Sequence, residues 1–276
     1  MKTINKIICP TDFTVTADNA IEYAAKLAQR LGAKIELIHV KSISITDSFV
    51  SEIVSDNIKT ISDRLQHICD EITKTYKVVS DFSVEVSLKR LEKVIVGKTM
   101  ENNLIVIGTN GTDNMHQYLF GTNAYNIIKK SKCPVLMIPE KATYKTIEKI
   151  VFAWDYSRNN RISFLQLKDF LDTYNPEIVF LHVSKHKTAI AEDIYSALKD
   201  EVFSYFGRKE TISFSKVNLD DEETVAQKMD SYVKEVHADM LAITIYDRGL
   251  FENIFHGDIA KYLSESVDYP LLAVHL

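Results

Sequence analysis

The residues with the clearest chemical potential lie in one segment, which holds three of the chain's eight glycines, Gly108, Gly111 and Gly121, and is followed by Thr122. An apolar run at residues 104–107 precedes it and is typical of a buried parallel strand. A short helical pattern that ends in two lysines follows it. A glycine-rich loop between a strand and a helix N-terminus presents free backbone N–H groups to an anion. The segment therefore predicts an anion-binding loop.

The spacing of these glycines differs from two common phosphate-binding motifs. The Walker loop needs Gly-Lys-Ser/Thr together, and the dinucleotide fingerprint needs G-x-G-x-x-G, whereas this chain has G-x2-G-x9-G-T. Glycine permits close backbone approach and positive φ, and Thr122 can cap the helix or donate its hydroxyl to a phosphate. Glycines also serve ordinary turns, so a surface loop without a ligand is the alternative.

The composition limits the class of protein. A chain of 276 residues with 46% hydrophobic and 26% charged residues is ordinary globular material, enough for one large domain or two of average size. The net charge of −5 argues against a general nucleic-acid or anionic-membrane surface. No apolar run approaches the roughly 18 residues of a membrane span, and the N-terminal segment lacks the pattern of a signal peptide.

The three cysteines, Cys9, Cys69 and Cys133, lack the C-x-x-C spacing of a zinc or redox site. They are typical of reduced, buried thiols, and we expect a cytoplasmic protein. His182 and His186 leave a predicted strand rather than share a helix face, so we expect no metal site there.

The chain repeats itself in four strand-like segments that recur in the same order, which indicates a tandem duplication. The first two pairs are offset by 143 residues and the last two by 136: residues 4–14 with 147–157, 35–40 with 178–183, 103–108 with 239–244, and 133–138 with 269–274.

Each half alternates apolar strands with amphipathic helices. In the first helix, Ile21, Ala24, Ala28 and Leu31 form an apolar stripe, and Gly32 is the stop signal. This alternation predicts an α/β fold of two tandem doubly wound parallel-sheet domains, flavodoxin-like or Rossmann-like, at residues 1–143 and 144–276.

In a doubly wound sheet, a ligand binds outside the carboxyl ends of the strands, where the strand order reverses. Thr11 and Asp12 follow the first predicted strand and the glycine segment follows the fourth, so both are expected at the same crevice. In this setting the pattern G-x2-G-x9-G-[S/T] resembles the ATP-binding loop of the universal stress protein family. Almost the whole chain resembles two such domains in tandem.

This resemblance implies ATP binding, with an acidic residue near the adenine and ribose, a backbone group at the end of the second strand on the base, and the glycine loop on the phosphates. Carried over by position, the implied contacts are Thr11, Asp12, Val40, Gly108, Asn110, Gly111, Gly121, Thr122 and Asn123. Between Gly108 and Ile128 there is no Lys or Arg. We therefore expect backbone N–H groups, the helix dipole, His116 and Mg²⁺ to balance the phosphate charge.

The second half has a degenerate loop. Thr244, Asp247, Gly257 and Asp258 stand where the first half has Gly108, Gly111, Gly121 and Thr122. Two acidic side chains would repel phosphates, so we expect nucleotide only in the first half. Asp155 in the second half matches Asp12 in the first. Either aspartate could instead cap a helix or fix a loop. Trp154 could fill part of the pocket that would hold the base in the second half.

The sequence thus favours a cytoplasmic stress-response module that binds an adenine nucleotide, without catalytic residues. There are two alternatives: a slow ATPase of the same fold, and an interaction protein that binds no nucleotide. Against the ATPase, no water-positioning base or arginine finger is evident near the loop. The last strands, residues 135–138 and 271–274, are expected at sheet edges, where pairing would give an intramolecular pseudo-two-fold dimer that could dimerise further. The sequence does not identify a protein partner.

Overall fold

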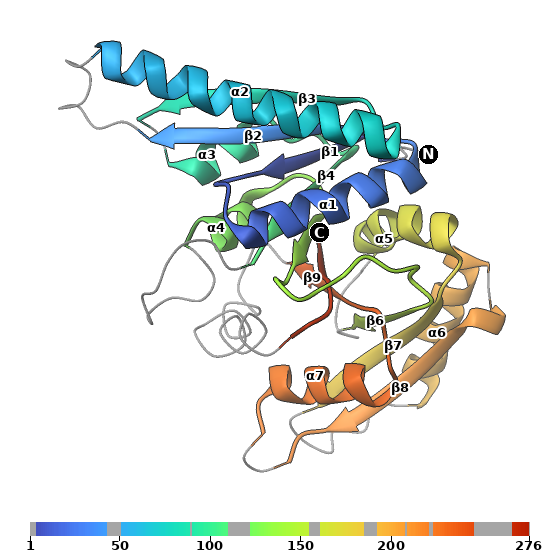
Figure 1. The fold of residues 1–276 in the computed structure, drawn as a ribbon. Coiled ribbons are helices and arrows are strands. Elements are labelled where there is room, and N and C mark those ends of the chain that lie inside the picture. Colours follow the sequence, from blue (N-terminus) through green and yellow to red (C-terminus); the bar gives the residue numbers. More distant parts are fainter. Residues whose placement is uncertain are drawn as a thin grey trace. The chain divides into compact units, whose positions relative to one another are not determined.

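The computed structural model describes residues 4–42, 51–88, 90–109, 122–154, 161–184, 192–207, 209–220, 223–245 and 267–275. The chain forms two compact units, Met1–Tyr144 and Lys145–Leu276 (Figure 1). Within the described residues, no helix combines the length and the apolar character that a bilayer crossing requires.

The first unit is a parallel sheet with the strand order β3-β2-β1-β4-β5. Figure 1 shows α1 and α2 over one face of this sheet and α3 and α4 on the other. The elements are β1 (Lys6–Pro10), α1 (Val15–Leu31), β2 (Lys34–Ser42), α2 (Ser51–Tyr76), β3 (Ser80–Ser87), α3 (Leu91–Gly97), β4 (Asn103–Gly108), α4 (Thr122–Lys130) and β5 (Val135–Ile138).

The second unit has the equivalent parallel order, β8-β7-β6-β9-β10. Its elements are β6 (Lys149–Ala153), α5 (Arg161–Tyr174), β7 (Glu177–Ser184), α6 (Glu192–Phe206), the 3-10 helix η2 (Lys209–Thr211), β8 (Ile212–Asn218), α7 (Val225–Glu235), β9 (Met240–Ile245) and β10 (Leu271–His275). The predicted α/β class with parallel sheets is confirmed.

Local signals in the sequence account for the ends of α1. The Thr14 side chain caps the helix by accepting a hydrogen bond from the Ala17 N–H. At the other end Gly32 adopts the left-handed conformation, with φ of 67°, and its N–H donates to the Ala28 carbonyl. Three residues of the predicted stripe, Ile21, Ala24 and Ala28, are buried, and the fourth, Leu31, is partly exposed at the end of the helix.

The two cores differ in composition. The first unit fills its core with aliphatic side chains from β1, β2 and β4. The second unit uses contacting aromatic rings, which are Phe152, Trp154, Phe164, Phe180, Phe206 and Phe214. Edge-to-face and offset ring pairs of this kind add stabilisation beyond the apolar area that they bury.

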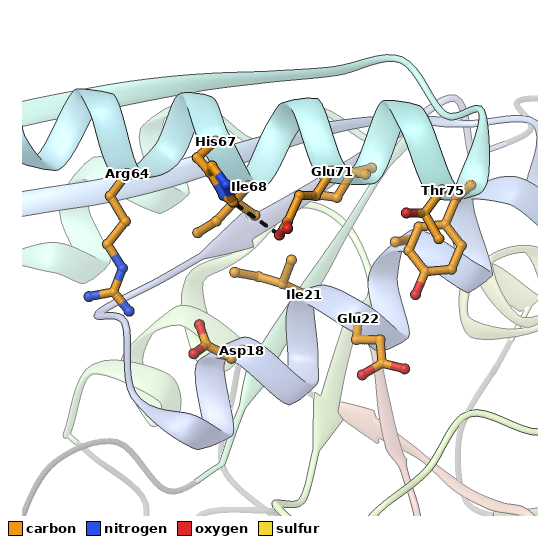
Figure 2. A pocket seen from close by; sticks show the side chains of 11 residues that line it. Asp18, Ile21, Glu22, Arg64, His67, Ile68, Glu71 and Thr75 are labelled. Carbon is orange, nitrogen blue, oxygen red and sulfur yellow. Dashed lines mark ion pairs between the residues drawn. The ribbon is translucent and has the colours of Figure 1, made fainter.

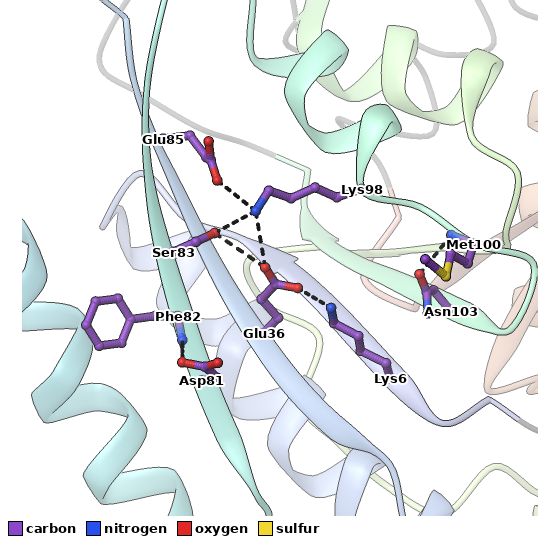
Figure 3. Close-up of polar contacts among 9 residues, drawn as sticks. All are labelled: Lys6, Glu36, Asp81, Phe82, Ser83, Glu85, Lys98, Met100 and Asn103. Carbon is purple, nitrogen blue, oxygen red and sulfur yellow. Dashed lines mark hydrogen bonds and ion pairs between the residues drawn. The ribbon is translucent and has the colours of Figure 1, made fainter.

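A polar network lies on the α3 face of the first sheet (Figure 3). The Glu36 carboxylate on β2 forms an ion pair with Lys6 on β1 and another, at 3.4 Å, with Lys98 after α3. Lys98 also pairs with Glu85 at 2.7 Å and donates a hydrogen bond to the Ser83 hydroxyl at 3.1 Å. The network therefore joins three neighbouring strands to the end of α3.

Candidate functional site

The strand order of the first unit reverses between β1 and β4, which pair in parallel with Lys6 opposite Asn103. Both strands end at the same edge of the sheet, where Thr11 follows β1 and Thr109 follows β4. Such a reversal leaves a crevice outside the strand ends, because the two connections leave in opposite directions. The candidate site is this edge of the first unit.

The turn after β1 is held by its own side chains. The Thr11 N–H donates to the Ile38 carbonyl at 2.9 Å, and the Thr11 hydroxyl accepts from the Phe13 N–H at 3.0 Å. The Asp12 Oδ1 accepts from both the N–H and the hydroxyl of Thr14, at 3.1 and 2.7 Å. Asp12 therefore fixes the entry to α1, as the alternative interpretation of this residue allowed. Its other oxygen, Oδ2, makes no hydrogen bond to a described residue and lies on an exposed side chain.

The backbone of Val40 is open toward this turn. In a parallel strand, successive residues direct their N–H and C=O groups to opposite neighbours. The Lys34 N–H bonds the Asn5 carbonyl and the Ile38 carbonyl bonds Thr11, so even-numbered residues of β2 face β1. Since β1 ends at Pro10, the N–H and C=O of Val40 face the space beyond its end. Within the described residues, this leaves one donor and one acceptor of the Val40 backbone without a partner.

Gly108 has a packing reason to be glycine. A Cβ on this residue would lie 2.8 Å from Thr16 Cγ2 and 2.9 Å from the Thr16 carbonyl oxygen. Both distances are shorter than real Cβ contacts, so β4 and the first turn of α1 meet here only because position 108 has no side chain. The glycine brings the start of α1 against the end of β4, at the edge that holds the candidate site.

Thr109 is a site residue that the sequence reasoning missed. Its N–H donates to the Ile138 carbonyl at 3.1 Å, the residue is 4% exposed, and its hydroxyl has no hydrogen-bond partner among the described residues. A buried hydroxyl without a partner is uncommon and costly. The available signal was its place directly after Gly108, inside the glycine segment.

The sequence reasoning also missed a stack of three side chains over the turn. The Phe13 ring lies against the His39 ring, with centroids 4.8 Å apart and planes inclined by 22°, and Arg64 Cζ lies 4.3 Å from the Phe13 centroid. Phe13 has φ of 65°, a conformation that a bulky residue rarely adopts. Only His39 carried a hint, because it lies next to Val40 near the end of the second predicted strand.

His39 also bonds the turn through its ring. Its Nδ1 lies 2.9 Å from the Thr11 carbonyl oxygen, to which a protonated Nδ1 donates. Burial lowers the pKa of His39, and the charges of Lys41 and Arg64 lower it further, while the Thr11 carbonyl and Asp12 act in the opposite direction. The second unit repeats this contact, with His182 Nδ1 3.1 Å from the Trp154 carbonyl oxygen.

Several expected contacts fall outside the described residues. Asn110, Gly111, His116 and Gly121 are among them, and so are Asp155, His186, Asp247, Gly257 and Asp258. Thr122 and Asn123 open α4 as expected, although their side chains lie outside the description. In the second unit, Thr244 lies in β9, 2% exposed, with a hydroxyl that has no partner among the described residues. Trp154 is buried against Phe180 and Phe214.

Comparison with known proteins finds a family model for residues 3–139 and relatives that match about half of the chain. The model of the "Universal stress protein family" matches residues 3–139. Universal stress protein MJ0531 of Methanocaldococcus jannaschii is 29% identical over 140 residues, which are 48% of this chain and 81% of that protein. Universal stress protein MJ0577 of the same organism is 25% identical over 155 residues, covering 49% and 95%.

Among solved structures, a universal stress protein from Archaeoglobus fulgidus DSM 4304 matches 99% of this chain and 98% of its own, with a TM-score of 0.76 and 14% sequence identity. At that identity the likeness establishes the fold alone. The family assignment rests on the sequence match to residues 3–139, which contain the candidate site. Residues 3–139 therefore form a domain that belongs to the universal stress protein family.

Proposed function

We propose that the first unit binds one ATP with Mg²⁺ at the edge described above, and that the protein acts in the cytoplasm as a stress-response binding module. The observation that carries this proposal is the open N–H and C=O of Val40 beside the free Asp12 oxygen. Such a set suits an adenine edge and a ribose hydroxyl. The glycine segment and the N-terminus of α4 would then receive the phosphates.

The cation would be held mainly by phosphate oxygens and water, as Mg²⁺ commonly is. In the described part of the chain, no three His, Cys, Asp or Glu side chains gather as a metal site would require. The backbone N–H groups at the start of α4 would supply the remaining positive potential. Mg²⁺ would spread the triphosphate charge during binding.

We further propose that residues 1–143 and 144–276 are two domains of one family, of which only the first keeps an intact nucleotide loop. Thr244 places a side chain where the first unit has Gly108. In sequence, Asp247 and Asp258 would add two negative charges to the equivalent loop. The second domain would then serve packing and partner contacts.

Isothermal titration with Mg-ATP tests this assignment. The parent protein is expected to bind one nucleotide per chain. Gly121→Val should weaken binding at least about tenfold, because a branched side chain keeps the backbone away from the phosphates. The matched variant Gly257→Val, in the second loop, should bind as the parent does.

Two binding events per chain in the parent, or undiminished binding in Gly121→Val, would contradict the proposal. Identifying the nucleotide released on denaturation separates the alternatives. ATP indicates a binding module, ADP indicates turnover, and failure to bind any adenine nucleotide favours an interaction protein.

A further inference from the structure

Arg64 projects from helix α2 toward the turn after β1. Its guanidinium lies over the face of the Phe13 ring, 4.3 Å from the centroid, and Phe13 directly follows Asp12. Stacking on an aromatic face orients the guanidinium plane while leaving its N–H donors at the edge. Figure 2 shows the side chain extending from α2 toward the first turn of α1.

Among the described residues, no carboxylate forms an ion pair with this guanidinium. Asp18 faces it from α1 (Figure 2), yet Arg64 has neither an ion pair nor a hydrogen bond with any other described residue. The side chain is exposed, so its donors are open to a ligand. An oriented arginine with unused donors is well suited to bind a phosphate.

A second cation strengthens the positive potential at this edge. Lys41 follows Val40 on β2 and has no ion pair with a described residue. The charges of both Lys41 and Arg64 depress the pKa of His39, so both cations act on the imidazole that bonds the turn. Asp12 is the acidic group that acts on His39 in the opposite direction.

The groove between α1 and α2 limits where an anion can lie. It has a volume of about 620 Å³, and its lining includes the carboxylates Asp18, Glu22 and Glu71 together with Arg64 and His67. Glu22 pairs with Lys26 at 2.7 Å and Glu71 with His67 at 3.7 Å, whereas Arg64 has no ion pair with a described residue. Among these groups Arg64 is therefore the cation best suited to an anion, and it lies beside the turn that carries Asp12.

We propose that Arg64 contacts the phosphate next to the ribose of the bound nucleotide, and so supplies from α2 the cation that the glycine segment lacks. This inference rests on the proposed ATP site. The Asp12 oxygen would take the ribose, and the phosphate attached to that ribose is the one nearest to Arg64.

Titration calorimetry with ATP, AMP and adenosine on the parent and on Arg64→Gln tests the contact. Arg64→Gln is expected to weaken ATP and AMP binding about tenfold and adenosine binding less than about twofold, because only the first two carry that phosphate. Arg64→Lys keeps the charge but not the paired donors and should fall between. The control Arg30→Gln makes the same charge change at the opposite end of α1 and should match the parent.

Equal losses for AMP and adenosine would mean that Arg64 acts only by supporting Phe13, and the inference would be wrong. Unchanged ATP binding in Arg64→Gln would also overturn it while leaving the ATP site intact. A parent protein that binds none of the three ligands would overturn the proposed function itself, and this contact with it.

Discussion

A methyl group at position 108 would collide with the first turn of helix α1. Gly108→Ala places a Cβ 2.8 Å from Thr16 Cγ2 and 2.9 Å from a backbone oxygen that cannot rotate away. We expect a loss of about 1–3 kcal/mol in the free energy of unfolding, because β4 and α1 must separate. Denaturant unfolding measures it, and Gly97→Ala is the control, since a Cβ there has no neighbour within 4 Å. An equal effect in both variants would contradict this account.

The buried hydroxyl of Thr244 is a weak point of the second unit. The residue is 2% exposed, and no described residue makes a hydrogen bond to its hydroxyl. Thr244→Val keeps the shape and removes the unsatisfied group, so we expect a gain of about 1 kcal/mol in unfolding free energy. Thermal denaturation measures the gain, and a destabilised variant would show that the hydroxyl has a partner after all.

Some residues of the candidate site could be predicted and others could not. Thr11, Asp12 and Val40 are next to strand ends, so their positions followed from the order of strands and helices. Arg64 is far from Asp12 in sequence and comes to the turn only through the packing of α2. No local pattern carries that information, because it depends on how two elements pack.

At the scale of elements, the Glu36 network is expected to stabilise the first sheet measurably. Glu36→Gln removes the charge that pairs with Lys6 and Lys98, in a side chain that is only 14% exposed. We expect a loss of about 1–2 kcal/mol in unfolding free energy, since hydrogen bonds to charged groups are stronger than neutral ones. Glu177→Gln breaks an ion pair whose carboxylate is 63% exposed and should change little. Equal effects in urea unfolding would argue against a special role for the network.

Hydrophobic periodicity predicted the elements well because parallel sheets bury their strands on both faces. The helix over residues 122–130 was predicted with its true limits, from Thr122 and the two lysines of its last turn. The end of α3 was harder to predict from the sequence. Periodicity places Lys98 within the helix, yet the helix ends at Gly97, and the Lys98 ammonium turns to Glu85 on β3. Periodicity records apolar faces and not such polar contacts.

At the scale of the whole molecule, stability should fall in two separate pH ranges. Burial lowers the pKa of His39 below its usual 6.5, so the unfolded chain binds its proton first, and unfolding free energy declines as the pH drops below about 6.5. The unfolding free energy stops declining once the pH has fallen below the pKa that His39 has in the folded protein. His39→Gln should abolish this first step in denaturant titrations at a series of pH values. An unchanged pH profile would contradict the role given to His39.

The second range begins below about pH 4.5. Burial acts to raise the pKa values of Glu36 and Asp239, but hydrogen bonds and ion pairs with lysines outweigh it and hold both below their usual values. The stability that these carboxylates contribute is present above pH 4.5 and is lost as they become protonated. His39→Gln should retain this second step.

The expected pairing of the last strands of the two halves, residues 135–138 and 271–274, stays a prediction.

Trp154 gives the second unit its own optical signal. It is the chain's only tryptophan, and its indole is 5% exposed and packed against Phe180 and Phe214. Indole emission shifts to longer wavelength when water reaches the ring, whereas circular dichroism sums both units. Tryptophan fluorescence therefore reports the unfolding of the second unit within the intact chain. A gap between the fluorescence and dichroism midpoints would measure how far the two units unfold independently, without any attached dye.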